Sequence, residues 1–452
     1  MNIYLHVEIS ARELDSKLLL AVLAASKGHQ VLISSLGNII NGINLKILKP
    51  GIFHTKSLTP GEDKIKRHQK IIDKGFKITS IDEEAGIGRD GYDKAAISRY
   101  SDLTIKQSSA VFGWGCEDTE TLKKIYFKHS NKIHKTGSPR VDLWKPFFSD
   151  YWVNPNEMPT KPYLLISSNF NCITQKPFYE DVKSLKKAGY FERDPDLYKN
   201  FFYNISEDYK KLYEFIDAIK YLAKKNNGYE IVLRPHPRDD LKAWKSFLED
   251  IPNVKIIKKD SITVWIKNAF AIMHNGCTSA IEATITGKPV LTYSPFEMKY
   301  SHKIPNTTGY NLRSKEELLM NANNIFNEKD KEKEITISEL ISKKLYIDND
   351  NLAADKIIKV WEGLDDGKLS HYNNWAYVHF VIKIIHLKRA FLKIFHKLFL
   401  NKFKTSKINH KFPKLNNKDI CARVDRLQKL LSINEKIECK ILSDRTILIK
   451  KL

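Results

Sequence analysis

The sequence predicts an α/β protein with two domains, each a mostly parallel sheet with helices on both faces, followed by a basic helical extension. Three observations predict it. Short apolar runs alternate with segments of helical period through most of the first 330 residues. A Pro-rich stretch at 152–162 interrupts that alternation once, after which it starts again. With 452 residues, 42% hydrophobic and 28% charged, the chain is long enough for two or three domains with their own cores.

The first domain is expected over residues 1–155. It opens with the apolar run 2–9, a helical pattern over 12–28 and a β-branched run at 29–35, which together predict a strand, a helix and a strand. Further strand-like runs lie near residues 80, 112 and 135. Such alternation is typical of a parallel sheet, because each return to the sheet needs a crossover helix.

The second domain is expected over residues 156–330, where the alternation restarts. Residues 331–369 read as a helical segment that closes this region, and 370–452 as a basic tail whose last residues could form a small hairpin. The strand-like runs of the second domain are YLLISSNF (163–170), YEIVLRPHP (229–237), VKIIK (254–258), AFAIMHNG (269–276) and KPVLTYSP (288–295).

The positive charge is concentrated in the tail. Lys and Arg number 75 against 53 Asp and Glu, a net charge of +22, and the interval between Asp366 and Asp419 holds twelve basic residues and no acidic one. Within it, residues 375–404 can form a helix with a basic face and an aromatic-rich apolar face, which is typical of helices that lie on an anionic membrane. The alternatives are that the helix packs on the protein itself or on another subunit, or that it binds nucleic acid. No nucleic-acid-binding module is recognisable.

The compartment is expected to be reducing. The five cysteines are scattered and include no C-x-x-C pair. The first residues lack the features of a secretory signal, and no apolar stretch is long enough to span a membrane. The prediction is therefore a cytoplasmic protein that binds the membrane surface peripherally.

The peptide Arg234-Pro235-His236-Pro237-Arg238 directly follows a predicted strand. A histidine held between prolines with an Arg on either side suits phosphate binding, because guanidinium and imidazole N–H groups donate to anionic oxygens. The sequence therefore assigns Arg234, His236 and Pro237 to a phosphate site, the alternative being a structural loop histidine.

A second peptide follows another predicted strand and opens a helix. Hydroxyls and free backbone N–H groups at a helix start favour anions. The alternative is that one hydroxyl only caps the helix. The candidate nucleotide-binding residues here are Asn275, Gly276, Thr278, Ser279 and, for a ribose, Glu282.

Three adjacent carboxylates, Asp82, Glu83 and Glu84, follow a strand-like run in the first domain. Neighbouring like charges should repel one another and raise at least one pKa, as a general base requires. A solvated acidic loop is the alternative. Which of the three would be the base stays open at this stage. No residue is assigned to a metal.

The three peptides together resemble motifs of the bacterial GT-B glycosyltransferases that use CMP-activated acidic sugars, the sialyltransferases and Kdo transferases of capsule and lipopolysaccharide assembly. The D/E-D/E-G, H-P and Ser/Thr-rich motifs of that family are matched by Asp82–Gly86, His236-Pro237 and Thr278-Ser279, although Ala85 separates the carboxylates from the glycine. Residues 1–320 also resemble surface carbohydrate biosynthesis proteins. TGSPRVDLW (136–144) and RPHP are similar to glycerophosphotransferases that use CDP-glycerol.

The resemblance implies two Rossmann-like domains and a metal-independent, inverting transferase. It would pass Kdo or a sialic-acid-like sugar from a CMP-sugar to a surface glycan or lipid-linked acceptor, at the inner face of the bacterial inner membrane. A carboxylate, Glu84 before Glu83 or Asp82, would deprotonate the acceptor, and His236 would help the phosphate leave. No cofactor is implied. The alternatives are a CDP-glycerol-type glycerophosphotransferase or another GT-B sugar-nucleotide enzyme.

Overall fold

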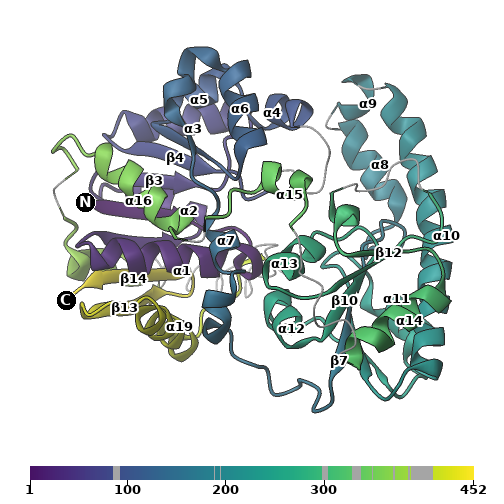
Figure 1. Cartoon of the computed structure of the whole chain (residues 1–452). Helices are drawn as coiled ribbons and strands as arrows, with labels where there is room; N and C mark the ends of the chain where they lie inside the picture. The colour runs from purple at the N-terminus through teal and green to yellow at the C-terminus, as the bar shows by residue number, and fades with distance from the viewer. Residues whose placement is uncertain are drawn as a thin grey trace, which may run out of the picture. The chain divides into compact units, whose positions relative to one another are not determined.

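The computed structural model comprises two compact units (Figure 1). Unit 1 comprises Met1–Gly86, Gly91–Leu143 and Ser342–Leu452, and unit 2 comprises Ile87–Asp90 and Trp144–Ile341. The residues that the structure describes are 1–84, 92–187, 189–193, 195–297, 304–327, 337–348, 350–369, 372–384, 387 and 411–452.

Unit 1 contains an eight-stranded sheet in the order β13-β14-β2-β1-β3-β4-β5-β6. The strands from β1 to β6 pair in parallel, as the alternating sequence predicts, and the hairpin β13–β14 adds antiparallel pairing at one edge. The strand order reverses beside β1, because β2 and β3 lie on opposite sides of it. The strands are β1 (Asn2–His6), β2 (Gln30–Ser34), β3 (Ile52–Thr55), β4 (Lys77–Ile81), β5 (Ala110–Gly113), β6 (Ile133–Lys135), β13 (Ile437–Ser443) and β14 (Thr446–Lys451).

The first helix of unit 1, α1, is apolar on nearly every side because it is enclosed on nearly every side. It contacts β2 and β14 as well as three further helices, α7, α16 and α19. Its residues 16–25 are all buried. The helices are α1 (Ser10–Ser26), α2 (Leu36–Asn44), α3 (Glu62–Ile72), α4 (Asp93–Arg99), α5 (Asp102–Gln107), α6 (Cys116–Ile125), η1 (Phe127–Lys132), α7 (Pro139–Asp142), α15 (Glu339–Lys344), which runs across the boundary with unit 2, α16 (Ala353–Gly363) and α19 (Asn417–Leu430).

The last part of the sequence belongs to unit 1. Trp361 of α16 is fully buried, stacks edge-on against His54 and donates its indole N–H to Thr79. The predicted hairpin is present, and β14 pairs with β2 because residues 446–449 are buried on both faces, as an interior strand requires. Figure 1 shows this yellow hairpin beside the purple helix α1.

The observed boundaries lie at 143/144 and 341/342, whereas the sequence placed them at 155/156, 330/331 and 369/370. The difference arises because a strand's partner is not encoded in the strand itself: the expected closing segment and tail supply core residues to the first sheet. Of the predicted amphipathic helix 375–404, residues 375–384 are helical, 387 is also described, and the remainder lies outside the described residues. Nowhere in the described chain is a helix both long and apolar enough to cross a bilayer.

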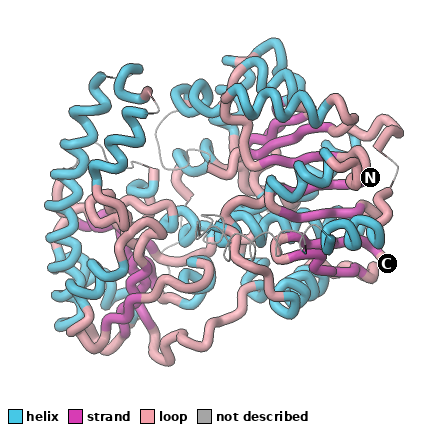
Figure 2. The backbone as a smooth tube through the Cα atoms, turned by 180° about the vertical axis from the view of Figure 1, so that it is seen from behind, coloured by secondary structure: helices cyan, strands magenta, loops and turns pink. Residues whose placement is uncertain are grey.

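Unit 2 contains a six-stranded, fully parallel sheet in the order β12-β11-β10-β7-β8-β9. Figure 2 shows helices on both faces of this sheet, where two apolar clusters form the core. The order reverses between β7 and β10. The strands are β7 (Tyr163–Ser167), β8 (Glu230–Arg234), β9 (Val254–Ile256), β10 (Ala271–His274), β11 (Val290–Tyr293) and β12 (Tyr310–Leu312). The helices are η2 (Pro146–Tyr151), α8 (Phe178–Lys187), α9 (Tyr190–Arg193), α10 (Pro195–Lys225), α11 (Leu241–Leu248), α12 (Ile262–Asn268), α13 (Ser279–Ile285), η3 (Pro305–Thr307) and α14 (Lys315–Phe326).

Candidate functional site

The carboxyl edge of the sheet in unit 2 brings together the two predicted nucleotide-binding peptides. One follows β8 and the other follows β10, while the loop after β7 lies between these two strands. Open parallel sheets bind ligands at such an edge, at the point where the strand order reverses. This edge is therefore the candidate ligand site of unit 2.

His236 is held by its own loop in a neutral form. Its backbone N–H donates to Ser168 Oγ at 3.1 Å and to Asp239 Oδ2 at 3.2 Å. Its Nδ1 accepts the backbone N–H of Arg238 at 3.2 Å, which leaves the ring proton on Nε2. Burial lowers the pKa of His236, and the nearby Asp239 charge only partly opposes this. At neutral pH the ring therefore offers an N–H donor without a positive charge.

Asp239 organises this loop and was not found from the sequence. Its Oδ2 accepts from Ser168 Oγ at 2.7 Å and from the indole N–H of Trp244 at 3.0 Å. The side chain is completely buried, and burial raises its pKa. Its Oδ1 is buried without a hydrogen-bond partner in the described structure. The signal available in the sequence was a carboxylate three residues after His236 that belongs to no helix pattern.

Arg234 lies beside the predicted phosphate site but uses its guanidinium internally. The group donates to the backbone carbonyl of Lys259 and, at 2.8 Å, to that of Asp260, and it stacks over Trp265. Burial lowers its pKa to about 10. These contacts anchor the loop after β9 and give no support to the predicted phosphate contact. Pro237 is exposed.

The loop after β10 is fixed to the loop after β7 by a pair of asparagines. Asn169 donates its backbone N–H to Asn275 Oδ1 at 2.9 Å, and Asn275 returns a bond to the Asn169 carbonyl at 3.1 Å. Gly276 has φ +103°, which a residue with a side chain rarely adopts, so a glycine is required at this turn. The two predicted peptides and the loop after β7 therefore form one braced edge.

The start of α13 carries the only part of the second peptide that points outward. Ser279 is buried and donates its hydroxyl to Ser167 at 2.9 Å, whereas Thr278 is exposed and makes no side-chain cap. No partner is recorded in the described structure for the backbone N–H of either residue. Glu282 is buried and accepts from Thr263, so its predicted contact with a ribose stays a prediction.

A lysine from the long helix α10 completes the edge and was also missed. Lys211 lies over the ring of Phe170, just after β7, with its Nζ 5.7 Å from the ring centroid. Burial lowers its pKa against the opposing charge of Asp208. Asp208 itself accepts the backbone N–H of Asn171 at 2.8 Å. Nothing in the sequence of α10 distinguishes Lys211 from the other lysines on that helix.

The three carboxylates of unit 1 follow β4, and each is paired with a cation. Asp82 accepts two bonds from Arg99. Glu83 accepts from Lys17 at 2.7 Å, in a pair whose side chains are only 2% and 1% exposed. Glu84 pairs with three cations, Arg12 at 3.1 Å, Lys56 at 3.3 Å and Arg99 at 3.4 Å.

Glu84 does not have the raised pKa that mutual repulsion predicts for at least one of these three carboxylates. Burial acts to raise the pKa of Glu84, but Lys56, Arg12 and Arg99 outweigh burial and lower it. A raised pKa appears instead at Glu13 in α1, where burial and then the charge of Glu83 are the causes. Ala85 and Gly86 of the predicted motif lie outside the described residues.

Comparisons with known proteins support the fold. No protein family and no curated protein matches the sequence. Among solved structures, the chain resembles a putative UDP-N-acetylglucosamine 2-epimerase from Listeria monocytogenes at 14% identity and a TM-score of 0.50, over 80% of this chain and 95% of the other. The UDP-GlcNAc 2-epimerase from Methanocaldococcus jannaschii is 14% identical, with a TM-score of 0.47, over 80% of this chain and 100% of the other. The wall teichoic acid polymerase TagF is 11% identical, with a TM-score of 0.49, over 82% of this chain and 90% of the other.

The chain therefore has the GT-B type of fold that the motifs implied, with two Rossmann-like sheets. The same comparison contradicts the predicted activity. The similar structure with a TM-score of 0.50 is a putative UDP-N-acetylglucosamine 2-epimerase, and nothing in it supports a CMP-sugar-dependent sialyltransferase or Kdo transferase. The expectation of an inverting transfer from a CMP-sugar is corrected on this finding. Short motifs at strand ends are shared by enzymes of different chemistry on this fold.

Proposed function

We propose that the chain is a sugar-nucleotide enzyme that holds the diphosphate of a UDP-linked sugar at the carboxyl edge of unit 2 and epimerises that sugar. The observation that carries the binding step is an edge with hydrogen-bond donors to spare. These are His236 Nε2–H, the backbone N–H groups of Thr278 and Ser279, and the ammonium of Lys211. A diphosphate offers only acceptors and negative charge, which such donors match.

The neutral state of His236 bears on its role. An imidazole whose pKa is lowered by burial donates through Nε2 over the whole physiological range. Asp239 fixes the loop through Ser168 and Trp244, so the donor is positioned before the ligand arrives. His236 is thus proposed to bind a phosphate oxygen, and Asp239 to be a positioning residue.

The choice of epimerisation is supported by the structural similarity to a putative UDP-N-acetylglucosamine 2-epimerase. Epimerisation needs no acceptor, so the glycan or lipid-linked acceptor that was predicted for a transferase is not part of this proposal. No cluster of three or more metal-ligating side chains occurs among the described residues. Metal independence remains a prediction, which activity after treatment with EDTA tests.

Calorimetric titration tests the binding step, with UDP, UDP-N-acetylglucosamine, CMP and CDP-glycerol as ligands. We expect the uridine ligands to bind, and His236→Ala to weaken them about tenfold to a hundredfold because a hydrogen bond to a charged oxygen is lost. His134→Ala, a half-buried histidine of unit 1, is the matched control and should bind like the wild type. Preference for the cytidine ligands would refute the assignment of the nucleotide.

Incubation with UDP-N-acetylglucosamine in D₂O tests the reaction. Epimerisation at carbon 2 exchanges the hydrogen of that carbon with solvent, so deuterium should appear there in recovered substrate and product. Tight uridine binding without deuterium incorporation would keep the binding site and refute the epimerisation.

A further inference from the structure

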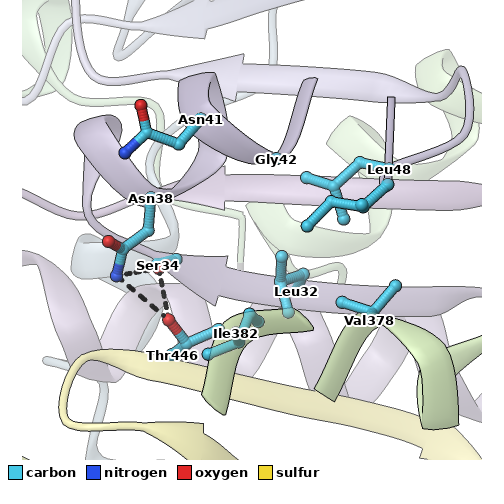
Figure 3. A pocket seen from close by; sticks show the side chains of 10 residues that line it. Leu32, Ser34, Asn38, Asn41, Gly42, Leu48, Val378, Ile382 and Thr446 are labelled. Atoms are coloured by element: carbon cyan, nitrogen blue, oxygen red, sulfur yellow. Dashed lines mark hydrogen bonds between the residues drawn. The ribbon is translucent and has the colours of Figure 1, made fainter. Parts of the chain in front are cut away.

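The helix at 375–384 packs on unit 1 through one face only. Val378 is fully buried in the core, and Trp375, Val381 and Ile382 pack against the same cluster. Figure 3 shows Val378 and Ile382 pointing towards β2 and the loop after α2, around a cavity of about 30 Å³. A cavity of this size holds about one water molecule, so the packed face is closed to larger ligands.

The start of the helix is fixed in the core. Asn373 is buried and donates its side-chain amide to Asn2 and to Tyr4, each at 2.9 Å. Its side-chain oxygen accepts the backbone N–H of Lys49 at 2.8 Å. The rotation of the helix about its axis is therefore set, and so is the face that it leaves exposed.

The exposed face is apolar. Phe380 and Ile384 each follow a packed residue by two positions, a step that turns an α-helix by about 200°. They are 61% and 47% exposed, and Tyr377 and Leu387 on the same side are 54% and 71% exposed. Four large apolar side chains at spacings of three or four residues form a continuous stripe, here called the aromatic stripe. Removing such a stripe from water is favourable.

Basic groups lie next to the aromatic stripe. A groove of about 340 Å³ is lined by His379 and Lys383 of the helix together with Lys414 and the hairpin β13–β14. Lys440 of β13 is exposed and directly precedes Ile441, which also lines the groove. Burial, and then the charges of Lys383 and Lys440, lower the pKa of His379. Asp444 neutralises Lys414 at 3.2 Å, but no ion pair of Lys383 is found in the described chain. The groove thus keeps a net positive charge.

From these observations we propose that the aromatic stripe and the groove form a docking surface for an anionic phospholipid bilayer, in which the apolar side chains enter the interface and headgroup phosphates face Lys383 and Lys440. The surface has the two parts that interfacial helices need, an apolar face and flanking cations. A second copy of the chain fits poorly, because each copy carries a net charge of +22 and the basic grooves of the two copies would repel each other. A nucleic acid would leave Ile384 and Leu387 without partners.

Vesicle co-sedimentation of the full chain tests the proposal, with phosphatidylcholine vesicles prepared with and without phosphatidylglycerol. We expect binding to the anionic vesicles only. Phe380→Ser/Ile384→Ser should lower the partition coefficient at least about tenfold, since two exposed apolar side chains are lost. Phe127→Ser removes a phenylalanine of η1 that is 68% exposed and is the matched control, which should bind like the wild type.

A charge variant keeps the test independent of the helix's apolar residues. Lys383→Glu should weaken binding about tenfold at low salt and less at high salt, because two units of charge change at the headgroup level. Equal binding to both vesicle types, or unchanged binding of both variants, would overturn the proposal. The proposal would also be overturned if the wild-type chain did not bind vesicles but formed a dimer, or bound a DNA oligonucleotide, and Phe380→Ser/Ile384→Ser abolished that association. None of these residues belongs to the proposed nucleotide site, so failure here leaves the enzyme proposal standing.

Discussion

The carboxyl edges of the two sheets have the same topology and opposite chemistry. In each sheet the strand order reverses beside the first strand, and polar loops gather there. In unit 1 the carboxylates Asp82, Glu83 and Glu84 are all paired with cations of the protein. In unit 2 the carboxylate Asp239 is buried among neutral donors, and the outward-facing groups are N–H donors. The comparison teaches that a strand-end position shows where a site can be, while side-chain pairing decides which ligand charge it accepts.

The largest expected effect concerns the buried pair of unit 1. Lys17→Met leaves Glu83 buried without its cation, which should lower the free energy of unfolding by about 3–5 kcal/mol. Urea denaturation followed by circular dichroism measures it. The double variant Lys17→Met/Glu83→Gln should recover most of the loss. An unaltered midpoint in the single variant would show that the edge of unit 1 does not depend on ion pairing.

The next largest expected effect is a loss of unfolding free energy at acid pH, to which His274 at the edge of unit 2 contributes. Burial lowers its pKa to about 3, while Nδ1 accepts the backbone N–H of Gly276 at 3.0 Å. Below about pH 6.5 the unfolded chain binds a proton at this residue and the folded chain does not, so stability falls as the pH falls. Between pH 6.5 and 4.5 one such histidine costs about 2–3 kcal/mol. His274→Gln should therefore show a shallower fall of unfolding free energy with pH, and an equal slope would contradict this.

A smaller effect should follow from removing the acceptor of unit 2. Asp239→Ala leaves the indole N–H of Trp244 and the hydroxyl of Ser168 without their acceptor, at about 1–3 kcal/mol of stability. Thermal unfolding measures the stability, and titration with UDP should show weaker binding because His236 loses its support. Asp239→Asn, which keeps an acceptor, should retain more of both. Unchanged UDP affinity in a destabilised Asp239→Ala would limit Asp239 to a folding role.

The smallest effect is expected at Glu84. The side chain is 39% exposed and shares its cations with other carboxylates, so Glu84→Gln should change the unfolding free energy by less than about 1 kcal/mol. If epimerase activity nevertheless falls by a factor of about 10² or more, Glu84 is an acid–base group, as the sequence first suggested. Activity close to that of the wild type would leave it a structural ion-pair partner.

The fold and the location of the candidate site could be predicted from the sequence, because both follow from apolar periodicity and from which residues come after each strand. The directions of side chains could not. The sequence predicts Arg234 as a phosphate ligand, but in the structure its guanidinium contacts the loop after β9. Asp239 and Lys211 could not be identified from the sequence because their partners lie in distant segments of the chain. The pairing of Ser34 with Thr446 joins positions 412 residues apart, a relation that no local pattern contains.

The pairing of β14 with β2 also bears on the order in which the chain is made. Residues 144–341 form unit 2 from one nearly continuous stretch, whereas the sheet of unit 1 keeps β2 as a bare edge until residues after 436 have been synthesised. Domains fold as they emerge from the ribosome, and an unpaired edge strand invites wrong pairing. Unit 2 is therefore expected to be complete while unit 1 is still waiting for its last strands, so this interval on the ribosome is the one in which the nascent chain most needs a chaperone.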